Sequence, residues 1–300
     1  MTHGLRALVL LLALAEGARL AAQPVTFRGG IDLTNFAVTV SDKKGELVGS
    51  LTKDDFEVFE DGKKQAVQYF AKGDGDMAPE LHLGLLIDAS GSMEQDLKLA
   101  RSAAIKFLNL LPEAVDITLV DFDTLVRITR YPQRDFPRLV ERIRMRKPDG
   151  YTALYDAIGT YLDGADQQPG RKIMVMYTDG GDTRSALSFN ETITLLKASQ
   201  VTVYAIGLVE NAGSARTDLR MKLQQLTETT GGQAFFPSHM KDVESTYDKV
   251  LGEIHAQYHL GYLSTNTSAD GAWRKVEIKL KNPDLKLRTR KGYFGPYKPN

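Results

Sequence analysis

Apolar and polar residues follow two different periods along this chain, and the periods divide it into a central region and two flanking regions. Between Leu81 and about Tyr258, nearly continuous apolar runs are separated by segments in which apolar residues recur every three or four positions. Continuous runs are typical of strands that helices cover on both faces, and the longer period is typical of amphipathic helices. We therefore predict an α/β fold, with a doubly wound, mostly parallel sheet flanked by helices.

The strands and helices of this region can be placed by residue number. Buried strands are predicted at residues 83–87, 115–120, 172–177 and 203–208. Helices are predicted from apolar stripes at residues 97–111, 154–161, 219–226 and 240–258. Residues 126–131 instead alternate between apolar and polar, which predicts an antiparallel edge strand after the second parallel one.

Strict alternation in both flanking regions predicts β structure there. It occurs at residues 36–40 near the start of the chain and at residues 276–280 after the last helix. A further strand-like run, residues 56–60, leads into Asp61-Gly62. This dipeptide favours a hairpin because both central positions of a type I′ turn need positive φ, and residues 67–70 are expected on the returning strand.

Neither flank supplies enough strands for a sheet that is stable alone. We therefore predict one β-sandwich built from both chain ends, with the α/β domain inserted between them, and two separate β modules are the alternative. The predicted domains are a signal peptide at 1–22, an N-terminal β segment at 23–78, the α/β domain at 80–256 and a C-terminal β segment at 257–300.

The signal peptide is predicted from the first residues. Arg6 precedes an apolar run that extends from Ala7 to Ala15, and the small residues Ala21 and Ala22 follow at the expected cleavage site. The run is shorter than the roughly 20 residues that span a bilayer. We expect a secreted or periplasmic protein with no transmembrane segment after cleavage.

Composition narrows the function. The chain has 38 basic and 38 acidic residues, so no overall charge favours nucleic acid or an anionic membrane. It has no cysteine, which excludes disulfides, thiolate metal sites and cysteine nucleophiles.

Oxygen-bearing side chains follow the predicted strands where the sheet should carry a ligand. Asp88, Ser90 and Ser92 come directly after the first strand, Thr152 precedes a helix, and Asp179 follows a third strand. Ligands of such folds bind beyond the carboxyl ends of the strands, so these side chains should converge. Two carboxylates and three neutral hydroxyls suit Mg2+, with Mn2+ or Ca2+ as substitutes.

Each of these residues also has a purely structural interpretation. Ser92 with Gln95 fits a helix capping box, Thr152 fits a helix N-cap, and Asp179 fits a turn before two glycines. Caps alone do not explain Ser90, nor the occurrence of all five residues after strands in this order. The metal site is therefore the preferred interpretation.

The five residues match, position by position, the metal-ion-dependent adhesion site (MIDAS) of von Willebrand factor type A (VWA) domains, and the resemblance covers about residues 81–258. The flanks at 54–62 and 290–294 resemble a bacterial secreted subgroup of such proteins. The resemblance implies that the partner contributes a carboxylate to the ion. In related domains the last helix shifts when ligand binds, and a rigid packed helix is the alternative for this chain.

We accordingly predict a non-enzymatic adhesion module whose partner is a protein that presents Asp or Glu. The partner-binding rim is predicted at Met93, Tyr151, Gly180 and Asp182. One alternative is a structural or assembly component whose ion only stabilises the loops.

The less favoured alternative is a Mg2+-dependent phosphatase. Asp121-Phe122-Asp123-Thr124 superficially resembles the nucleophile loop of haloacid-dehalogenase-like phosphatases, but the usual glycine before the threonine is absent. Both carboxylates are instead expected to be solvated in a loop between two strands.

Overall fold

The computed structural model describes residues 33–73, 75–94, 96–209 and 212–298. The predicted signal peptide therefore lies outside the described residues. Within them, no helix combines the length and apolar character needed to cross a membrane.

The central sheet has six strands in the order β10-β9-β8-β5-β6-β7. The strands are β5 (Leu81–Asp88), β6 (Ala114–Phe122), β7 (Val126–Pro132), β8 (Arg171–Thr178), β9 (Val201–Gly207) and β10 (Gln233–Phe235). All neighbouring strands are parallel except β7, which pairs antiparallel with β6 at the edge. The four predicted strands and the edge strand are confirmed, and β10 was not predicted.

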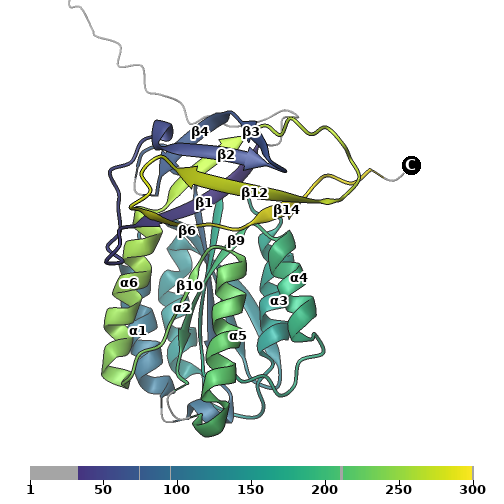
Figure 1. Cartoon of the computed structure of the whole chain (residues 1–300). Coiled ribbons are helices and arrows are strands. Elements are labelled where there is room, and N and C mark those ends of the chain that lie inside the picture. The colour runs from purple at the N-terminus through teal and green to yellow at the C-terminus, as the bar shows by residue number, and fades with distance from the viewer. Residues whose placement is uncertain (1–32, 74, 95, 210–211, 299–300) are drawn as a thin grey trace, which may run out of the picture. The chain divides into compact units, whose positions relative to one another are not determined.

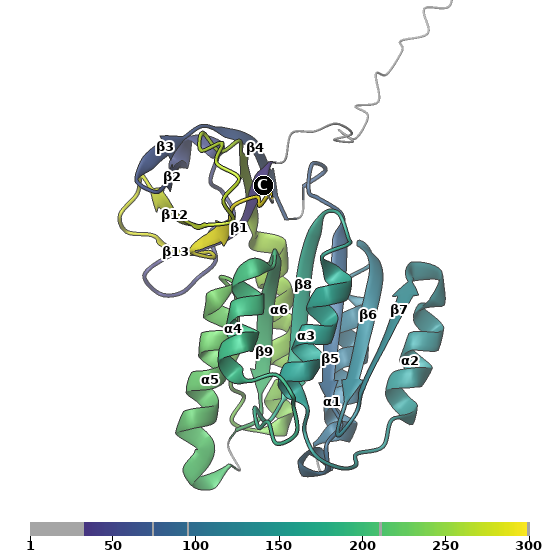
Figure 2. The same ribbon diagram turned by 90° about the vertical axis from the view of Figure 1, so that its right-hand side faces the viewer.

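Helices cover both faces of this sheet (Figures 1 and 2). They are α1 (Leu97–Asn109), α2 (Phe136–Met145), α3 (Leu154–Ala165), α4 (Phe189–Ala198), α5 (Arg216–Thr229) and α6 (Val243–Ala256). Short 3-10 helices are η1 (Lys53–Asp55), η2 (Gly91–Met93), η3 (Gln133–Asp135), η4 (Gly213–Ala215) and η5 (Met240–Asp242).

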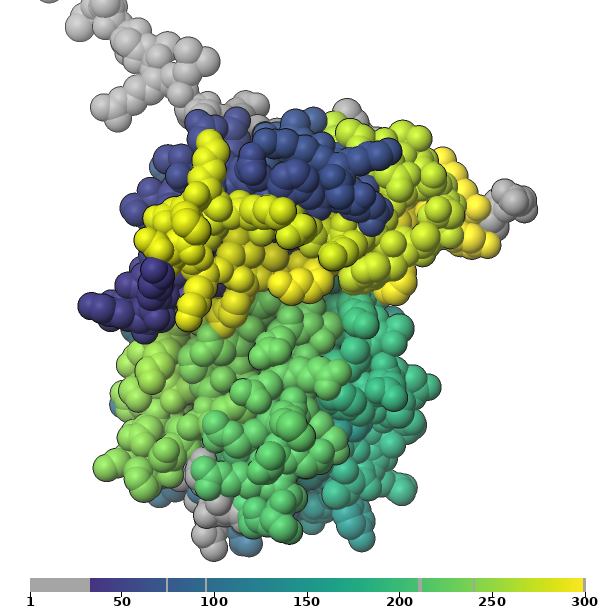
Figure 3. Space-filling model, in the orientation of Figure 1, coloured from purple at the N-terminus to yellow at the C-terminus, as the bar shows by residue number. Residues whose placement is uncertain are grey.

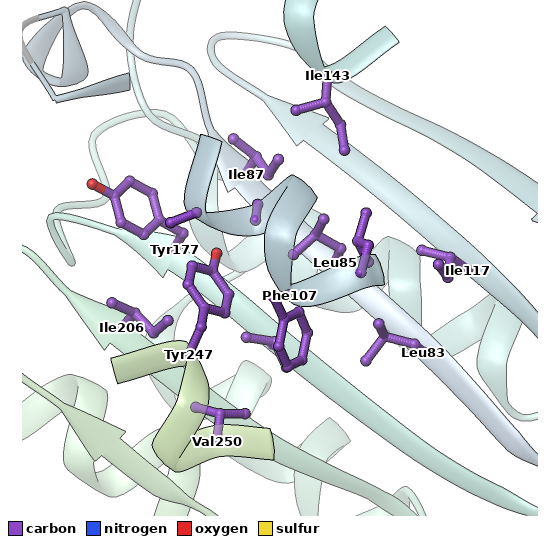
Figure 4. Close-up of a cluster of buried hydrophobic side chains, with 14 of the residues drawn as sticks. Leu83, Leu85, Ile87, Phe107, Ile117, Ile143, Tyr177, Ile206, Tyr247 and Val250 are labelled. Atoms are coloured by element: carbon purple, nitrogen blue, oxygen red, sulfur yellow. The ribbon is translucent and has the colours of Figure 1, made fainter. Parts of the chain in front are cut away.

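Side chains of β5 alternate between two hydrophobic cores. Leu85 and Ile87 pack with α1, α2 and α6, as Figure 4 shows for Phe107 and Tyr247, whereas Leu86 packs with α3, α4 and α5. Burial of both faces explains why the strands have continuous apolar runs. The predicted doubly wound architecture is confirmed.

The last helix is shorter than predicted. It ends at Ala256, because Gln257 has extended backbone angles, and Tyr258 begins the strand β11 (Tyr258–Tyr262). The ring of Tyr258 lies 5.3 Å from that of Phe56, in a different core from α6. Helices α2 and α4 were not predicted.

Both flanking regions together form two further sheets, with strand orders β13-β1-β11-β4 and β14-β12-β2-β3. Their remaining strands are β1 (Thr34–Ser41), β2 (Phe56–Glu60), β3 (Lys63–Gln65), β4 (Val67–Lys72), β12 (Trp273–Leu280), β13 (Lys286–Arg288) and β14 (Gly292–Phe294). Strands of the two chain ends pair directly, β1 with β11 and β2 with β12, and Figure 3 shows the purple and yellow segments side by side. One core fills the space between the sheets, which confirms the sandwich built from both ends.

The predicted hairpin forms with a different returning strand. Asp61 and Gly62 have φ of 47° and 82°, as a type I′ turn requires, but the strand that returns is β3. Buried Gln65 ends β3, since it exchanges hydrogen bonds with Thr265 at 3.0 and 3.1 Å. Residues 67–70 therefore belong to β4, which pairs with β11 in the facing sheet.

The sandwich contacts the amino ends of the central strands. The Arg290 guanidinium donates to Ser199 O at 3.2 Å, just before β9. Gly73, which follows β4, donates its N–H at 2.7 Å to the O atom of Gln257, between α6 and β11. A strand of eight residues is about 26 Å long, so the carboxyl ends of β5 and β8 lie roughly that far away. The edge that carries the candidate site is therefore remote from the sandwich.

Candidate metal centre

Asp88 lies at the carboxyl end of β5 with its side chain 0% exposed. One carboxylate oxygen accepts the N–H of Ser90 at 3.0 Å, and the other accepts the Thr178 hydroxyl at 2.6 Å. The Thr178 hydroxyl in turn accepts the Gly180 N–H at 3.0 Å. Two adjacent strands thus fix the orientation of this carboxylate.

The electrostatic environment of Asp88 disfavours its ionised form. Burial, together with the smaller effect of the nearby negative charge of Asp179, raises its pKa to about 6, against the hydrogen bonds from Ser90 and Thr178, which lower it. No basic side chain among the described residues offsets the charge of Asp88. A bound divalent cation would do so, and the residues therefore fit the ion that the sequence implies.

The two serines lie immediately beyond Asp88. Ser90 is buried, Ser92 is exposed, and their hydroxyl oxygens are 3.1 Å apart. Helix α1 begins at Leu97 with Asp96 as its N-cap, so Ser92 does not cap it. Gln95 lies outside the described residues. The capping alternative therefore does not account for Ser92.

The loop before α3 is joined to the β5 loop. Gly91 donates to Gly150 O at 3.1 Å, and Asp149 donates to Ala89 O at 2.9 Å. Gly150 has φ of 70°, and a Cβ there would lie 2.3 Å from Thr124 Oγ1, so only glycine fits. This close approach sets the position of Thr152.

Thr152 is buried, and its backbone oxygen accepts the N–H groups of Thr183 and Arg184 at 2.9 and 3.0 Å. The N-cap of α3 is Ala153, so Thr152 is not the cap that the structural alternative requires. The β5, α3 and β8 loops therefore form one hydrogen-bonded unit.

Asp179 follows β8 and is partly exposed. One of its oxygens accepts the Gly181 N–H at 3.0 Å, which is the turn that the structural alternative predicts. Its other oxygen has no hydrogen bond to the described residues. The turn thus orients Asp179 through one carboxylate oxygen, and the second oxygen remains available to bind a metal ion.

The predicted rim residues differ in exposure. Tyr151 is 65% exposed, whereas Met93 is 1% exposed, because it packs in the core with α1. Gly180 is buried, and Asp182 accepts hydrogen bonds from Tyr155 N and the Ser185 hydroxyl. The burial of Met93 removes it from the accessible rim, and Tyr151 supplies the large exposed side chain.

The candidate site contains no histidine or cysteine and only two acidic residues. Among the described residues, no group of three or more His, Cys, Asp or Glu is placed to hold a metal ion. The candidate site instead has two carboxylates and three hydroxyls, all oxygen donors. Such a set suits a hard cation that retains water, and it disfavours zinc or copper.

Asp121 and Asp123, which the sequence analysis expected to be solvated, are buried instead. Asp121 pairs with Arg142 at 2.9 Å, and Asp123 pairs with Arg127 at 3.3 Å. Arg146 pairs with both carboxylates. The arginines of residues 142–146 were the signal in the sequence, but the pairing depends on α2 returning alongside β7.

Comparison with known proteins identifies the family of the α/β region that carries the candidate site. The family model of the von Willebrand factor type A domain matches residues 82–249. A search of curated proteins finds no match.

Three solved structures are similar in fold. The PilB minor pilin from Streptococcus sanguinis is 13% identical with a TM-score of 0.50, and the match covers 61% of this chain and 63% of the pilin. The pilus adhesin SpaC from Lactobacillus rhamnosus GG is 10% identical with a TM-score of 0.51, over 85% of this chain and 49% of SpaC. The vWF domain of the type V pili tip protein Mfa5 from Porphyromonas gingivalis is 14% identical with a TM-score of 0.50, over 59% and 95%.

The chain thus spans less than two thirds of PilB and SpaC. At these identities the likeness concerns the fold alone.

Proposed function

The chain belongs to the von Willebrand factor type A domain family, and from that membership we propose that it is a Mg2+-dependent protein-binding module. The ion would be held at the five candidate ligands Asp88, Ser90, Ser92, Thr152 and Asp179. The observation that carries the proposal is the buried Asp88 carboxylate, which has no basic partner among the described residues and lies where three loops meet.

The charges of the candidate ligands explain how a partner would be attracted. Asp88 and Asp179 together balance a divalent cation, and the three hydroxyls add no charge. When bound, Mg2+ would supply an electrophilic centre that accepts a carboxylate oxygen from a partner. The protein's own residues keep the donors in place: Thr178 and Ser90 orient Asp88, and the joined loops fix Thr152.

Adhesion or assembly outside the cytoplasm is the setting that we propose. The similar solved structures include a minor pilin, a pilus adhesin and a pilus tip protein. Together with the apolar N-terminal run, these likenesses support a secreted or periplasmic module that binds an acidic protein surface without catalysis.

The two alternative functions would require different properties of the site. In a structural component, the ion would stabilise the loops and no partner carboxylate would bind. In a phosphatase, Asp121 would have to attack phosphate, but its carboxylate is buried and paired with Arg142 and Arg146. We therefore favour capture of a partner.

The metal proposal is tested by the thermal stability of wild type and Ser92→Ala in Mg2+ and in EDTA. The Ser92 hydroxyl is exposed and bonds only to Ser90 among the described residues, so its loss should spare the fold. At a hundredfold excess over Kd, ligand linkage stabilises the folded state by about 2.7 kcal/mol, which raises Tm by several degrees. We expect this rise in wild type and a much smaller one in Ser92→Ala.

Ser102→Ala on α1 is the matched control, because the Ser102 hydroxyl is also exposed and bonds only to Lys98 O among the described residues. It should retain the full increase. An identical Tm for wild type in Mg2+ and EDTA, with no heat of Mg2+ binding by calorimetry, would rule out the metal site.

A further inference from the structure

The two sides of the candidate metal site carry opposite charge. Glu94 and Asp96 immediately before α1, with Asp179 and Asp182 in the loop after β8, outnumber the one basic residue of these segments, Arg184. A partner that brings several acidic residues would be repelled on this side.

The other side, toward α2, is rich in arginine. The β6–β7 loop and the C-terminal end of α2 are joined there by the ion pairs of Asp121 and Asp123 with Arg127, Arg142 and Arg146. Figure 2 shows α2 beside β7 at the edge of the sheet. Three guanidinium groups against two carboxylates leave this cluster with one positive charge in excess.

Further basic side chains on this side have no acidic partner among the described residues. Arg144 and Lys147 are exposed, and neither has an acidic partner among the described residues. Arg101 donates to Arg144 O at 3.2 Å, whereas its Nε and Nη2 groups have no acceptor in the part of the chain that the structure describes. The exposed Asp149, two residues after Lys147, offsets one of these charges. The remaining positive excess is a local feature, because the whole chain has no net charge.

Exposed apolar side chains accompany these charges. Met145, Tyr151 and Leu125 are 77%, 65% and 62% exposed and are three of the four most exposed large apolar side chains among the described residues. Tyr151 N donates to Thr124 Oγ1 at 2.9 Å, so Tyr151 and Leu125 lie on adjoining loops. Arg146, the residue after Met145, forms an ion pair with Asp123 and so brings Met145 close to the same loop. Clustered exposed apolar groups mark interaction surfaces.

We propose that Leu125, Arg144, Met145, Lys147 and Tyr151 form a docking surface for an acidic segment of the partner protein. The segment would place one carboxylate at the metal site next to Thr152 and extend toward α2, with an apolar side chain on Tyr151 and further acidic residues near Arg144 and Lys147. This inference rests on the proposed function, and it adds the direction and chemistry of the bound segment.

Synthetic peptides of about twelve residues test the inference. All have a central Asp and a neighbouring Leu, and their flanks are acidic, neutral or basic. Binding is measured by fluorescence anisotropy in Mg2+ and in EDTA. We expect acidic flanks to bind about tenfold more tightly than neutral ones in Mg2+, and Arg144→Glu/Lys147→Glu to abolish that preference. The Leu125→Ser/Met145→Ser variant should weaken the binding of every peptide severalfold, because all of them contain Leu.

Lys197→Glu/Lys249→Glu is the matched control, with the same charge change on exposed residues of α4 and α6, and it should bind as wild type does. Mg2+-dependent binding with the same affinity for acidic, neutral and basic flanks would overturn the docking surface and leave the proposed function standing. An equal loss of affinity in Arg144→Glu/Lys147→Glu and in the control Lys197→Glu/Lys249→Glu would do the same. Acidic peptides that bind equally well in EDTA, through Arg144 and Lys147, would support the docking surface and contradict metal-dependent capture. Absence of binding by every peptide would contradict both.

Discussion

Asp88, a candidate metal ligand, shows at the scale of one residue how a buried charge can lower the stability of the fold. Its carboxylate is fully buried near Asp179. It accepts hydrogen bonds from two uncharged groups, the Ser90 N–H and the Thr178 hydroxyl. Burial raises its pKa to about 6. An ionised group in this position costs stability unless a cation compensates for its charge.

We predict that Asp88→Asn stabilises the metal-free protein. The amide keeps the shape of the side chain and removes the buried charge, so the free energy of unfolding in EDTA at pH 7.5 should rise by about 1–2 kcal/mol. Urea unfolding measures this change. The variant should gain nothing from Mg2+, unlike wild type. A less stable variant in EDTA would mean that other groups already compensate for the charge.

At the scale of elements, α2 is held to the sheet by charge as well as by its apolar face. That face is narrow, with Leu139 and Ile143 as its buried residues, and Arg146 just beyond the helix reaches Asp121 and Asp123 on β6 and its loop. The position of the helix end, and with it the proposed docking surface, therefore depends on this ion-pair cluster.

Arg146→Met should destabilise the protein by about 3 kcal/mol, because the methionine fills part of the space but leaves two buried carboxylates with fewer partners. Arg138→Met, at an exposed position of the same helix with no ion pair among the described residues, should change stability by less than about 0.5 kcal/mol. Chemical denaturation of both variants gives the comparison, and equal stabilities would contradict a structural role for the cluster.

The sequence predicted elements well where burial alone determines the pattern. The central strands β5, β6, β8 and β9 contain nearly continuous apolar runs because helices cover both faces, so local composition was sufficient to predict them. Helix α2 was missed because it is short, four of its ten residues are charged, and only Leu139 and Ile143 are buried.

Features set by tertiary contacts could not be predicted in this way. The sheet to which residues 67–70 belong depends on Gln65 meeting Thr265, two hundred positions away. The ion pairs of Asp121 and Asp123 depend likewise on the path of α2. The candidate ligands were found because parallel strands bring their carboxyl ends together, whereas the burial of Met93 follows from packing that no spacing reveals.

At the scale of the whole described structure, the sandwich and the α/β region meet around buried polar groups. His259 of β11 is buried, its Nε2 has no hydrogen bond to the described residues, and the Arg171 guanidinium at the start of β8 lies near it. Burial, with that positive charge, lowers the pKa of His259 to about 3. The joint between the two regions therefore requires a neutral imidazole.

Stability should consequently fall with acidification. The unfolded state binds a proton on His259 near pH 6.5 and the folded state only near pH 3, so the contribution of this group is complete above pH 6.5 and is lost as the pH falls. We expect a loss on the order of 2–3 kcal/mol between pH 6.5 and pH 4. His259→Phe should show a shallower pH dependence of unfolding in urea. An unchanged slope would show that other groups cause the acid sensitivity.

The position of β5 in the sheet also has a mechanical consequence. The chain enters β5 beside the sandwich at Leu81 and leaves it at Asp88, and parallel partners, β6 and β8, flank it on both sides. Tension between a captured partner and the sandwich would therefore run along the strand axis. The hydrogen bonds of both ladders would share this tension in shear and would not open one after another. The proposed ligand site, at the far end of a central strand, would therefore make the protein a tether that resists pulling.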